Sequence, residues 1–230
     1  MSDFQFKRFG ISQDRCAMKV GTDGVLLGAW AEGGSRILDV GSGTGLISLM
    51  MAQRFPLAQV IGIDMDGEAC SQASENVASS PFSKQVSISQ SRLQDFTTDE
   101  VFDSIVSNPP FFVNSMKNPD NKRSMARHAD TLPFRDLWNG VKRLLSEEGC
   151  FSVILPSEVV EQFVSEGCIS GFYLVRRCAV KTVGRKAPKR FLLAFSRHRN
   201  KEMEDAVEVM LDASGKRSDW YVKLTDEFYI

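Results

Sequence analysis

Residues 39–45 (DVGSGTG) decide the fold of this 230-residue chain. They follow a short apolar run, residues 35–40 (SRILDV), and they precede residues 45–54 (GLISLMMAQR), whose apolar side chains have helical spacing. Glycines let the backbone turn tightly and let a ligand approach without a Cβ in the way. A glycine-rich turn between a strand and a helix is where a doubly wound sheet binds a nucleotide-like ligand. The stretch therefore predicts such a site.

Strand and helix signals alternate along the rest of the chain. The apolar patterns predict strands at 60–64, 85–90, 102–107 and 149–155, and helices at 67–79, 132–146 and 157–166, the last with Ser157 as a candidate cap. Residues 172–183 and 189–197 are rich in β-forming residues and are joined by residues 184–188, so they indicate a long hairpin. The chain is therefore expected to be α/β, with a mostly parallel Rossmann-like sheet that ends in an antiparallel hairpin.

Composition and charge exclude several classes of function. The 28 Lys and Arg against 29 Asp and Glu give a net charge of −1, so the overall charge indicates neither a nucleic-acid nor a membrane partner. No apolar run reaches the roughly 18 to 20 residues that span a bilayer, and the start of the chain lacks a signal-peptide core, so a cytoplasmic protein is expected. The five cysteines form no CxxC pair and the two histidines no HExxH motif, so no metal is expected.

The spacing of residues around the glycine-rich turn narrows the choice among possible ligands. Asp64 ends the second strand, about 20 residues beyond the turn, where a carboxylate accepts the ribose hydroxyls in such sites. A dinucleotide fingerprint would need a third glycine where Leu46 stands, and no Walker Gly-Lys-Ser/Thr follows the turn. The pattern D-x-G-x-G-x-G with a later acid at a strand end resembles the S-adenosylmethionine site of the seven-stranded methyltransferases. In that superfamily Asp39 and the turn face the methionine moiety, and Asp64 holds the ribose.

A second motif, Asn108-Pro109-Pro110-Phe111, follows the strand at 102–107 and so lies at the same carboxyl edge of the sheet. An exocyclic amine is a poor nucleophile because its lone pair is delocalised into the adjacent π system. The Asn108 side-chain oxygen and the Pro109 carbonyl can each accept one N–H and so aim the lone pair at a methyl donor. Phe111 can stack on a planar substrate. Alone the motif would indicate a β-turn; beside the glycine-rich turn it resembles the amino-methyltransferases of adenine, cytosine or glutamine nitrogen.

The N-terminal segment, residues 1–34, carries a third pattern. Residues 4–9 alternate aromatic and polar side chains, and residues 21–24 (GTDG) predict a turn before a helix at 24–30 that Asp23 or Thr22 caps. The run QDRCAMKVGTDGVLLGAW, with DVGSGTGLISLM, SNPPFF, a basic RxxKxxxH segment and the ending EFYI, is similar to one bacterial family over nearly the whole chain. That family comprises the tRNA (adenine-N(6))-methyltransferases that modify the adenine just 3′ of the anticodon in a valine tRNA.

The resemblance implies a Rossmann-like, seven-stranded methyltransferase sheet and a role for particular residues. It implies a catalytic set of Asn108, Pro109, Pro110 and Phe111, and an S-adenosylmethionine site of Asp39, Gly41, Gly43, Gly45 and Asp64, with Lys19, Thr22, Asp23 and Gly24 closing over it. Many relatives place an acid after the third strand, where it binds the cofactor adenine, but residues 91–95 here are SRLQD. Arg92 cannot accept a hydrogen bond. Asp95 or a backbone carbonyl is the candidate instead.

A tRNA substrate needs a basic surface, and residues 176–201 contain many Lys and Arg and no Asp or Glu. A solvated face would be the usual explanation of such a run. Because the hairpin neighbours the active edge, RNA contact is predicted instead. The candidates are Arg185, Lys186, Lys189 and Arg190, with Arg123 and Arg127 in a loop after the catalytic motif that also contains Lys117, Lys122 and His128.

The domain prediction follows from these assignments: residues 1–34 close over the cofactor, residues 35–201 form the methyltransferase core, and residues 202–230 form an extension packed on it. A monomer is expected. Three alternatives remain open: a glutamine-amide protein methyltransferase, a DNA adenine methyltransferase, and a nonenzymatic RNA-binding module that retains the cofactor fold. The first usually has a helical N-terminal domain and the second a separate target-recognition domain, and cofactor binding would discriminate the third.

Overall fold

Five parallel strands form the half of the sheet that carries the glycine-rich turn. The computed structural model describes residues 3–16, 19–110, 132–199 and 202–230. The strands are β3 (Arg36–Val40), β4 (Gln59–Asp64), β5 (Val86–Gln90), β6 (Phe102–Ser107) and β7 (Leu145–Pro156). They follow the order β7-β6-β3-β4-β5, so the carboxyl ends of β3 and β6 are neighbours.

The other half of the sheet contains the predicted hairpin and an additional strand. β9 (Arg190–Ser196) is antiparallel to β7 and to β8 (Tyr173–Val183). β10 (Glu204–Leu211) then adds to the edge of the sheet, parallel to β8, which makes eight strands among the described residues. The seven strands that the sequence analysis expects are confirmed. The eighth comes from residues 202–230, which supply an edge strand and α7 (Asp219–Thr225).

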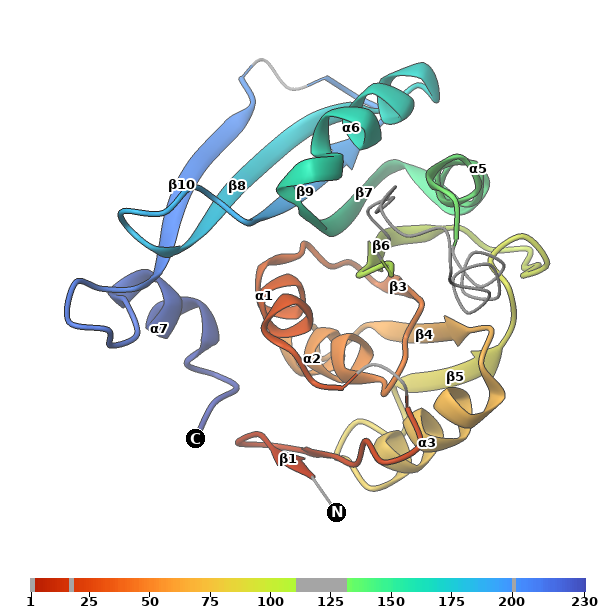
Figure 1. Cartoon of the computed structure of the whole chain (residues 1–230). Helices are drawn as coiled ribbons and strands as arrows, with labels where there is room; N and C mark the ends of the chain where they lie inside the picture. The colour runs from red at the N-terminus through yellow and green to blue at the C-terminus, as the bar shows by residue number, and fades with distance from the viewer. Residues whose placement is uncertain (1–2, 17–18, 111–131, 200–201) are drawn as a thin grey trace, which may run out of the picture.

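Helices cover both faces of the sheet (Figure 1). One face carries α1 (Thr22–Trp30), α2 (Leu46–Arg54), α3 (Gly67–Ala78) and α7; their apolar side chains form one buried cluster with a small sheet of β1 (Phe4–Gln5) and β2 (Gly10–Ile11). The other face carries α5 (Phe134–Leu144) and α6 (Val160–Ile169), whose cluster centres on Trp138. Trp138 lies fully buried against four aromatic rings, so this face is a packed core.

α1 packs closely on α2 because its glycines allow the approach. A Cβ on Gly28 would lie 2.7 Å from the Sδ of Met50, and a Cβ on Gly24 would lie 3.0 Å from the Leu46 side chain. Every residue from position 24 to position 30 is buried. The N-terminal segment is therefore an integral part of one core, and its position beside α2 brings it to the glycine-rich turn.

Two predicted helix caps are wrong. α1 begins at Thr22 with Gly21 at the N-cap position and no capping side chain, so Thr22 and Asp23 lie in the first turn. Ser157 does not cap the next helix either, because residues Ser157–Val159 form a 3₁₀ turn that leads into α6. In both places the helical backbone begins earlier than predicted, so the expected capping residues already lie within the first turn.

Three features bear on membrane association, disulfide formation and metal binding. None of the helices that the structure describes is long and apolar enough to cross a membrane. All five cysteines are free, and four of them are buried. In the described parts of the chain, no three His, Cys, Asp or Glu side chains gather into a group that could hold a metal ion.

Candidate functional site

The glycine-rich turn is held open by backbone geometry that favours glycine. Gly41, Gly43 and Gly45 have φ values of 75°, 52° and 80°, in the left-handed region where a Cβ is strained. The Gly41 and Ser42 N–H groups both donate to the Ile63 carbonyl, at 2.9 and 3.0 Å. The turn is therefore fastened to the end of β4, and α2 starts directly after Gly45.

The turn forms one wall of a cavity of about 340 Å³ at the carboxyl edge of the sheet. Three segments distant in sequence line it: residues 19–24, residues 41–44 with Leu46 and Ile47, and residues 108–110. The predicted residues that it brings together are Lys19, Thr22, Asp23, Gly24, Gly41, Gly43, Asn108, Pro109 and Pro110. Two motifs and the N-terminal segment thus meet in one place.

Asp39 lies directly beneath this turn and is completely buried. Its Oδ2 accepts a hydrogen bond of 2.7 Å from the Ser48 hydroxyl, whereas its Oδ1 has no hydrogen-bond partner among the described residues. Burial raises the pKa of Asp39 to about 7, against the opposing effect of the Ser48 hydrogen bond. The Ser42 hydroxyl, in the lining of the cavity, is also buried and has no partner in the part of the chain that the structure describes. Unsatisfied buried polar atoms are rare, so they indicate a place for ligand atoms.

Asp64 lies at the end of β4, the neighbour of β3, as predicted. Its Oδ2 accepts from the Gly43 N–H at 2.8 Å and its Oδ1 accepts from the Asp66 N–H at 3.0 Å. The carboxylate thus fixes the glycine-rich turn itself. Each of its oxygens keeps a second lone pair, so the group can still accept hydroxyl hydrogens.

The Asn108-Pro109-Pro110 motif is set beside the turn by the end of β6. Ser107 is fully buried, and its hydroxyl donates to the Val40 carbonyl at 2.9 Å, which ties the last residues of β6 and β3 together. Asn108 is half-buried and lines the cavity. The motif and the turn therefore form adjacent walls of one site. Phe111, predicted to stack on the substrate, lies outside the described residues.

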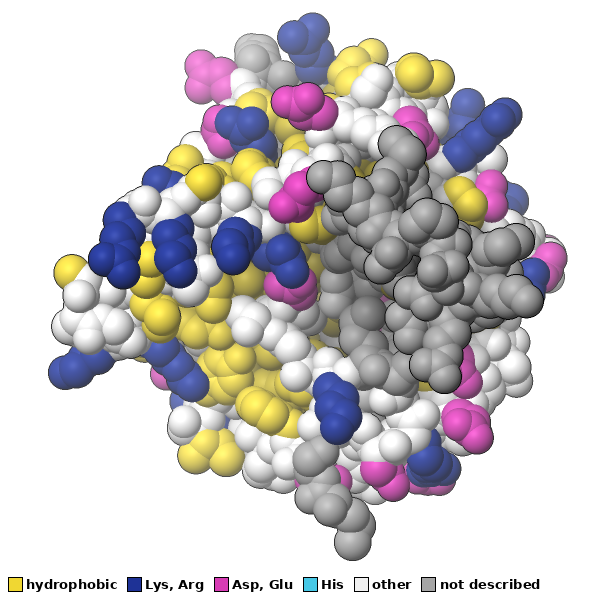
Figure 2. Space-filling view, in the orientation of Figure 1, with side chains coloured by type: hydrophobic (Ala, Val, Ile, Leu, Met, Phe, Trp, Pro, Cys, Tyr) yellow, Lys and Arg dark blue, Asp and Glu magenta, His cyan; other side chains and the backbone are white. Residues whose placement is uncertain are grey.

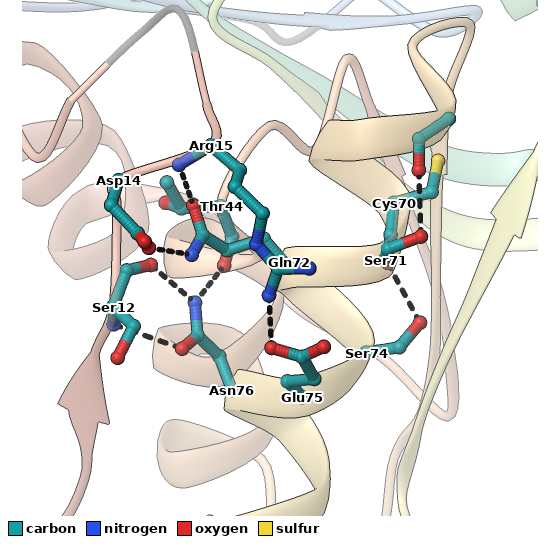
Figure 3. Close-up of polar contacts among 11 residues, drawn as sticks. Ser12, Asp14, Arg15, Thr44, Cys70, Ser71, Gln72, Ser74, Glu75 and Asn76 are labelled. Atoms are coloured by element: carbon teal, nitrogen blue, oxygen red, sulfur yellow. Dashed lines mark hydrogen bonds and ion pairs between the residues drawn. The ribbon is translucent and has the colours of Figure 1, made fainter.

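Two amide side chains on α3 hold the N-terminal segment against the turn (Figure 3). Asn76 is buried; its Oδ1 accepts from the Ser12 N–H, and its Nδ2 donates to the carbonyls of both Ser12 and Thr44, each at 2.9 Å. Because Thr44 belongs to the glycine-rich turn, this one amide connects the segment, the helix and the turn. A saturated buried amide of this kind specifies one arrangement of all three.

The second amide, Gln72, lies one helical turn before Asn76 on α3. Its Oε1 accepts from the Arg15 N–H at 2.9 Å, and its Nε2 donates to Asp14 Oδ1 at 2.6 Å (Figure 3). This hydrogen bond holds the pKa of Asp14 below its ordinary value. Neither amide was predicted from the sequence, although their i, i+4 spacing among the buried residues of α3 is a signal for buried polar partners.

Four predicted residues of the cofactor site are not part of the cavity lining. Asp39 and Gly45 lie behind its wall, and Asp64 supports that wall, as described above. Asp95, the candidate for the cofactor adenine, is exposed and is also absent from the lining. The carbonyl of Arg92 accepts from the backbone N–H groups of Asp95 and Phe96.

The β8–β9 hairpin with its turn at residues 184–189, the basic hairpin, lies at the same edge of the sheet as the cavity. Arg190 at the start of β9 is paired with Pro156 at the carboxyl end of β7, and with Val180 of β8. Figure 2 shows a row of Lys and Arg side chains on this part of the surface. Arg185, Lys186 and Lys189 are exposed and have no ion-pair partner among the described residues. Arg123, Arg127, Lys117, Lys122 and His128 lie outside the described residues.

Other cations of this region already have partners. Arg176 and Arg177 of β8 form ion pairs with Glu204 and Asp205 of β10, and Arg190 forms one with Asp23. These arginines are therefore at least partly neutralised within the protein. Arg190 is predicted to contact RNA, and a phosphate group would have to compete with Asp23 for its guanidinium.

Comparison with known proteins agrees with this geometry. Residues 20–132 match the model of the methyltransferase small domain family. The tRNA1(Val) (adenine(37)-N6)-methyltransferase of Phocaeicola vulgatus is 45% identical over 99% of this chain and 97% of its own length. The protein of that name from Tolumonas auensis is 40% identical over 99% and 96%.

Solved structures support the fold. A predicted O-methyltransferase from Agrobacterium tumefaciens superposes with a TM-score of 0.69 at 19% identity, over 90% of this chain and 96% of that one. A putative RNA methyltransferase from Pyrococcus horikoshii gives a TM-score of 0.51 at 21% identity, over 71% and 75%. The resemblance inferred from the sequence motifs is confirmed: the chain belongs to the tRNA1(Val) (adenine(37)-N6)-methyltransferase family.

Proposed function

We propose that the chain transfers the methyl group of S-adenosylmethionine to the exocyclic N6 amine of an adenine in tRNA, the adenine just 3′ of the anticodon of a valine tRNA. One observation carries the proposal: the glycine-rich turn and Asn108-Pro109-Pro110 form walls of the same cavity. The names of the relatives supply the substrate. We expect the enzyme to act in the cytoplasm, and as a monomer.

The residues around the turn fit S-adenosylmethionine. The Ser42 hydroxyl, which lines the cavity and has no partner among the described residues, can accept an N–H of a ligand, and the buried carboxyl of Asp39 behind the wall favours a ligand that carries positive charge. A Cβ on Gly41 would meet no atom of the described residues within 4 Å, so the described part of the protein leaves room for ligand atoms at this glycine. Asp64 keeps lone pairs for the ribose hydroxyls. The bound cofactor would supply an electrophilic methyl group on a sulfonium.

The chain's own residues would orient the target amine. The Asn108 side-chain oxygen and the Pro109 carbonyl accept the two N–H groups of the adenine amine, which directs the nitrogen lone pair towards the methyl group. Proline fixes φ at Pro109 and Pro110, so the Pro109 carbonyl is held in place. To reach this edge, the adenine must leave its stack in the RNA loop. Phe111 is proposed to receive it by stacking.

The basic hairpin is the proposed docking surface for the tRNA backbone. Lys181 of β8 has no ion-pair partner in the described chain, and it adds to Arg185, Lys186 and Lys189 around the hairpin turn. Exposed cations without an ion-pair partner can bind phosphate without first breaking an interaction within the protein, and they release the counterions of the phosphate. Arg123 and Arg127 would extend this surface.

The test is methyl transfer from labelled S-adenosylmethionine to total bacterial tRNA, with nucleoside analysis of the product. DNA and a release-factor protein serve as parallel substrates. The proposal predicts labelled N6-methyladenosine in the tRNA reaction alone. Label in the protein would instead favour a glutamine-amide methyltransferase, label in DNA a DNA methyltransferase, and cofactor binding without any transfer would leave a nonenzymatic module.

A further inference from the structure

The ion pair between Arg190 and Asp23 joins the basic hairpin to the rim of the cavity. Arg190 Nε lies 2.7 Å from Asp23 Oδ2, and its Nη1 donates to the Lys189 carbonyl at 3.0 Å. The two partners are 167 residues apart in sequence, and their side chains are 37% and 28% exposed. Asp23 lines the cavity and belongs to the first turn of α1.

The two ends of this ion pair differ in how firmly the backbone holds them. Arg190 is paired on both sides within the sheet, to Pro156 and to Val180, so its backbone is fixed. Gly21 is the N-cap residue of α1, so the first turn of this helix has no side-chain cap among the described residues. An acidic residue in the first turn is favoured by the helix dipole, so Asp23 offers a stable negative charge there. The arginine therefore reaches from a rigid strand to a helix end that lacks its own cap.

A partly exposed ion pair adds little to the free energy of unfolding. Its value here lies in geometry, because a guanidinium holds a carboxylate in a defined orientation. Two arginines of the neighbouring strand β8, Arg176 and Arg177, form their ion pairs within the sheet, with residues of β10. Arg190 forms its ion pair with a residue that lines the cavity.

We infer that Arg190 is a positioning residue that acts through Asp23: it fixes the cavity rim at the start of α1 to the base of the basic hairpin. This inference rests on the proposed function, in which the hairpin binds tRNA and the cavity binds S-adenosylmethionine. The exposed cations of the hairpin turn at residues 184–189 then bind phosphate, while Arg190 keeps the rim of the cavity at a fixed distance from those cations. Arg190 itself does not contact RNA.

The test compares Arg190→Ala with Lys186→Ala, a neighbouring cation without an ion-pair partner in the described chain. Two quantities are measured: the Kd for S-adenosylmethionine by calorimetry without tRNA, and the slope of log K against log salt for tRNA binding. Lys186→Ala should reduce the salt slope by about 1, because one phosphate contact is lost. Arg190→Ala should leave that slope unchanged and raise the cofactor Kd by about fivefold.

Rescue distinguishes positioning from a general loss of structure. Arg190→Lys retains the charge but lacks the planar guanidinium, so it should recover only part of the cofactor affinity, whereas Asp23→Asn should reproduce the defect of Arg190→Ala. A salt slope that falls by about 1 in Arg190→Ala with an unchanged cofactor Kd would overturn the inference and make Arg190 a phosphate contact. Salt slopes that stay unchanged in both Lys186→Ala and Arg185→Ala would remove the hairpin from the proposed function, while the cofactor Kd would still test the ion pair.

Discussion

The glycine-rich turn and the basic hairpin lie at the same edge of the sheet, but their polar groups are held in opposite ways. Around the turn, Asp39 and Asn76 are buried and bonded to groups of the protein. At the hairpin, Arg185 and Lys186 are exposed and have no ion-pair partner among the described residues. A buried site can orient a small cofactor, whereas an exposed row of cations can follow a flexible phosphate backbone. Substitutions around the turn should therefore change cofactor affinity or turnover, whereas substitutions at the hairpin should change RNA binding.

The largest effect is expected at the catalytic wall of the cavity. Asn108→Ala removes one of the two proposed acceptors for the target amine, so the turnover rate should fall on the order of a hundredfold or more. Cofactor affinity should stay nearly intact, since Asp39 and the turn are unchanged. Single-turnover transfer and calorimetry measure the two quantities. A fully active variant would remove Asn108 from the mechanism.

The next effect concerns the buried carboxyl beneath the turn. With its pKa raised to about 7, Asp39 is largely protonated in the cofactor-free protein at pH 6. The positive charges of S-adenosylmethionine favour the carboxylate, so binding releases a proton. Cofactor affinity should rise with pH up to about 7, by at most about tenfold per pH unit, and then level off. Calorimetry over this pH range tests the effect, and an equal rise in Asp39→Asn would contradict it.

Asp39 also determines the direction in which the free energy of unfolding changes with pH in the absence of cofactor. The pKa of Asp39 is higher in the folded state than its ordinary value of 3.8, because burial disfavours the charged form. The contribution of Asp39 to the free energy of unfolding is therefore fully present below pH 3.8 and is lost as pH rises through about 7. The free energy of unfolding of Asp39→Asn should lack this decline. Urea unfolding at several pH values provides the control for the binding experiment.

A smaller effect is expected where α3 meets the N-terminal segment. Asn76→Leu leaves the Ser12 N–H and the Thr44 carbonyl without their partner, which costs about 1 to 3 kcal/mol of unfolding free energy. Because Thr44 belongs to the turn, cofactor affinity should also fall, by about fivefold. Glu75→Gln is the matched control, since the ion pair of Glu75 with Arg15 is exposed. Equal cofactor affinity in Asn76→Leu and in the control would show that the amide has no role in the site.

The contrast between the two regions also explains what the sequence could predict. The turn at 41–45 and the motif at 108–110 each follow a buried strand, and parallel strands bring their carboxyl ends to one edge. Their meeting in one cavity is therefore a consequence of local patterns and of a simple topological rule. The backbone path, with left-handed glycines at 41, 43 and 45, follows from the same short stretch.

Contacts between distant segments were not predictable in this way. Nothing near Arg190 in sequence indicates an ion pair with Asp23, and nothing near Ser12 indicates hydrogen bonds with Asn76. Strand β10 was also missed, because Glu204–Leu211 mixes charged and apolar residues as an edge strand does. Each of these contacts depends on packing between elements, which a local pattern does not contain.

The most direct test of the account uses one tRNA and a single changed base. Unmodified valine tRNA is compared with the same tRNA in which the adenine just 3′ of the anticodon is replaced by guanine, each incubated with labelled S-adenosylmethionine. We expect one methyl group on the first tRNA and none on the second. Equal label in both would contradict the proposal that this cavity acts on the amine of that adenine.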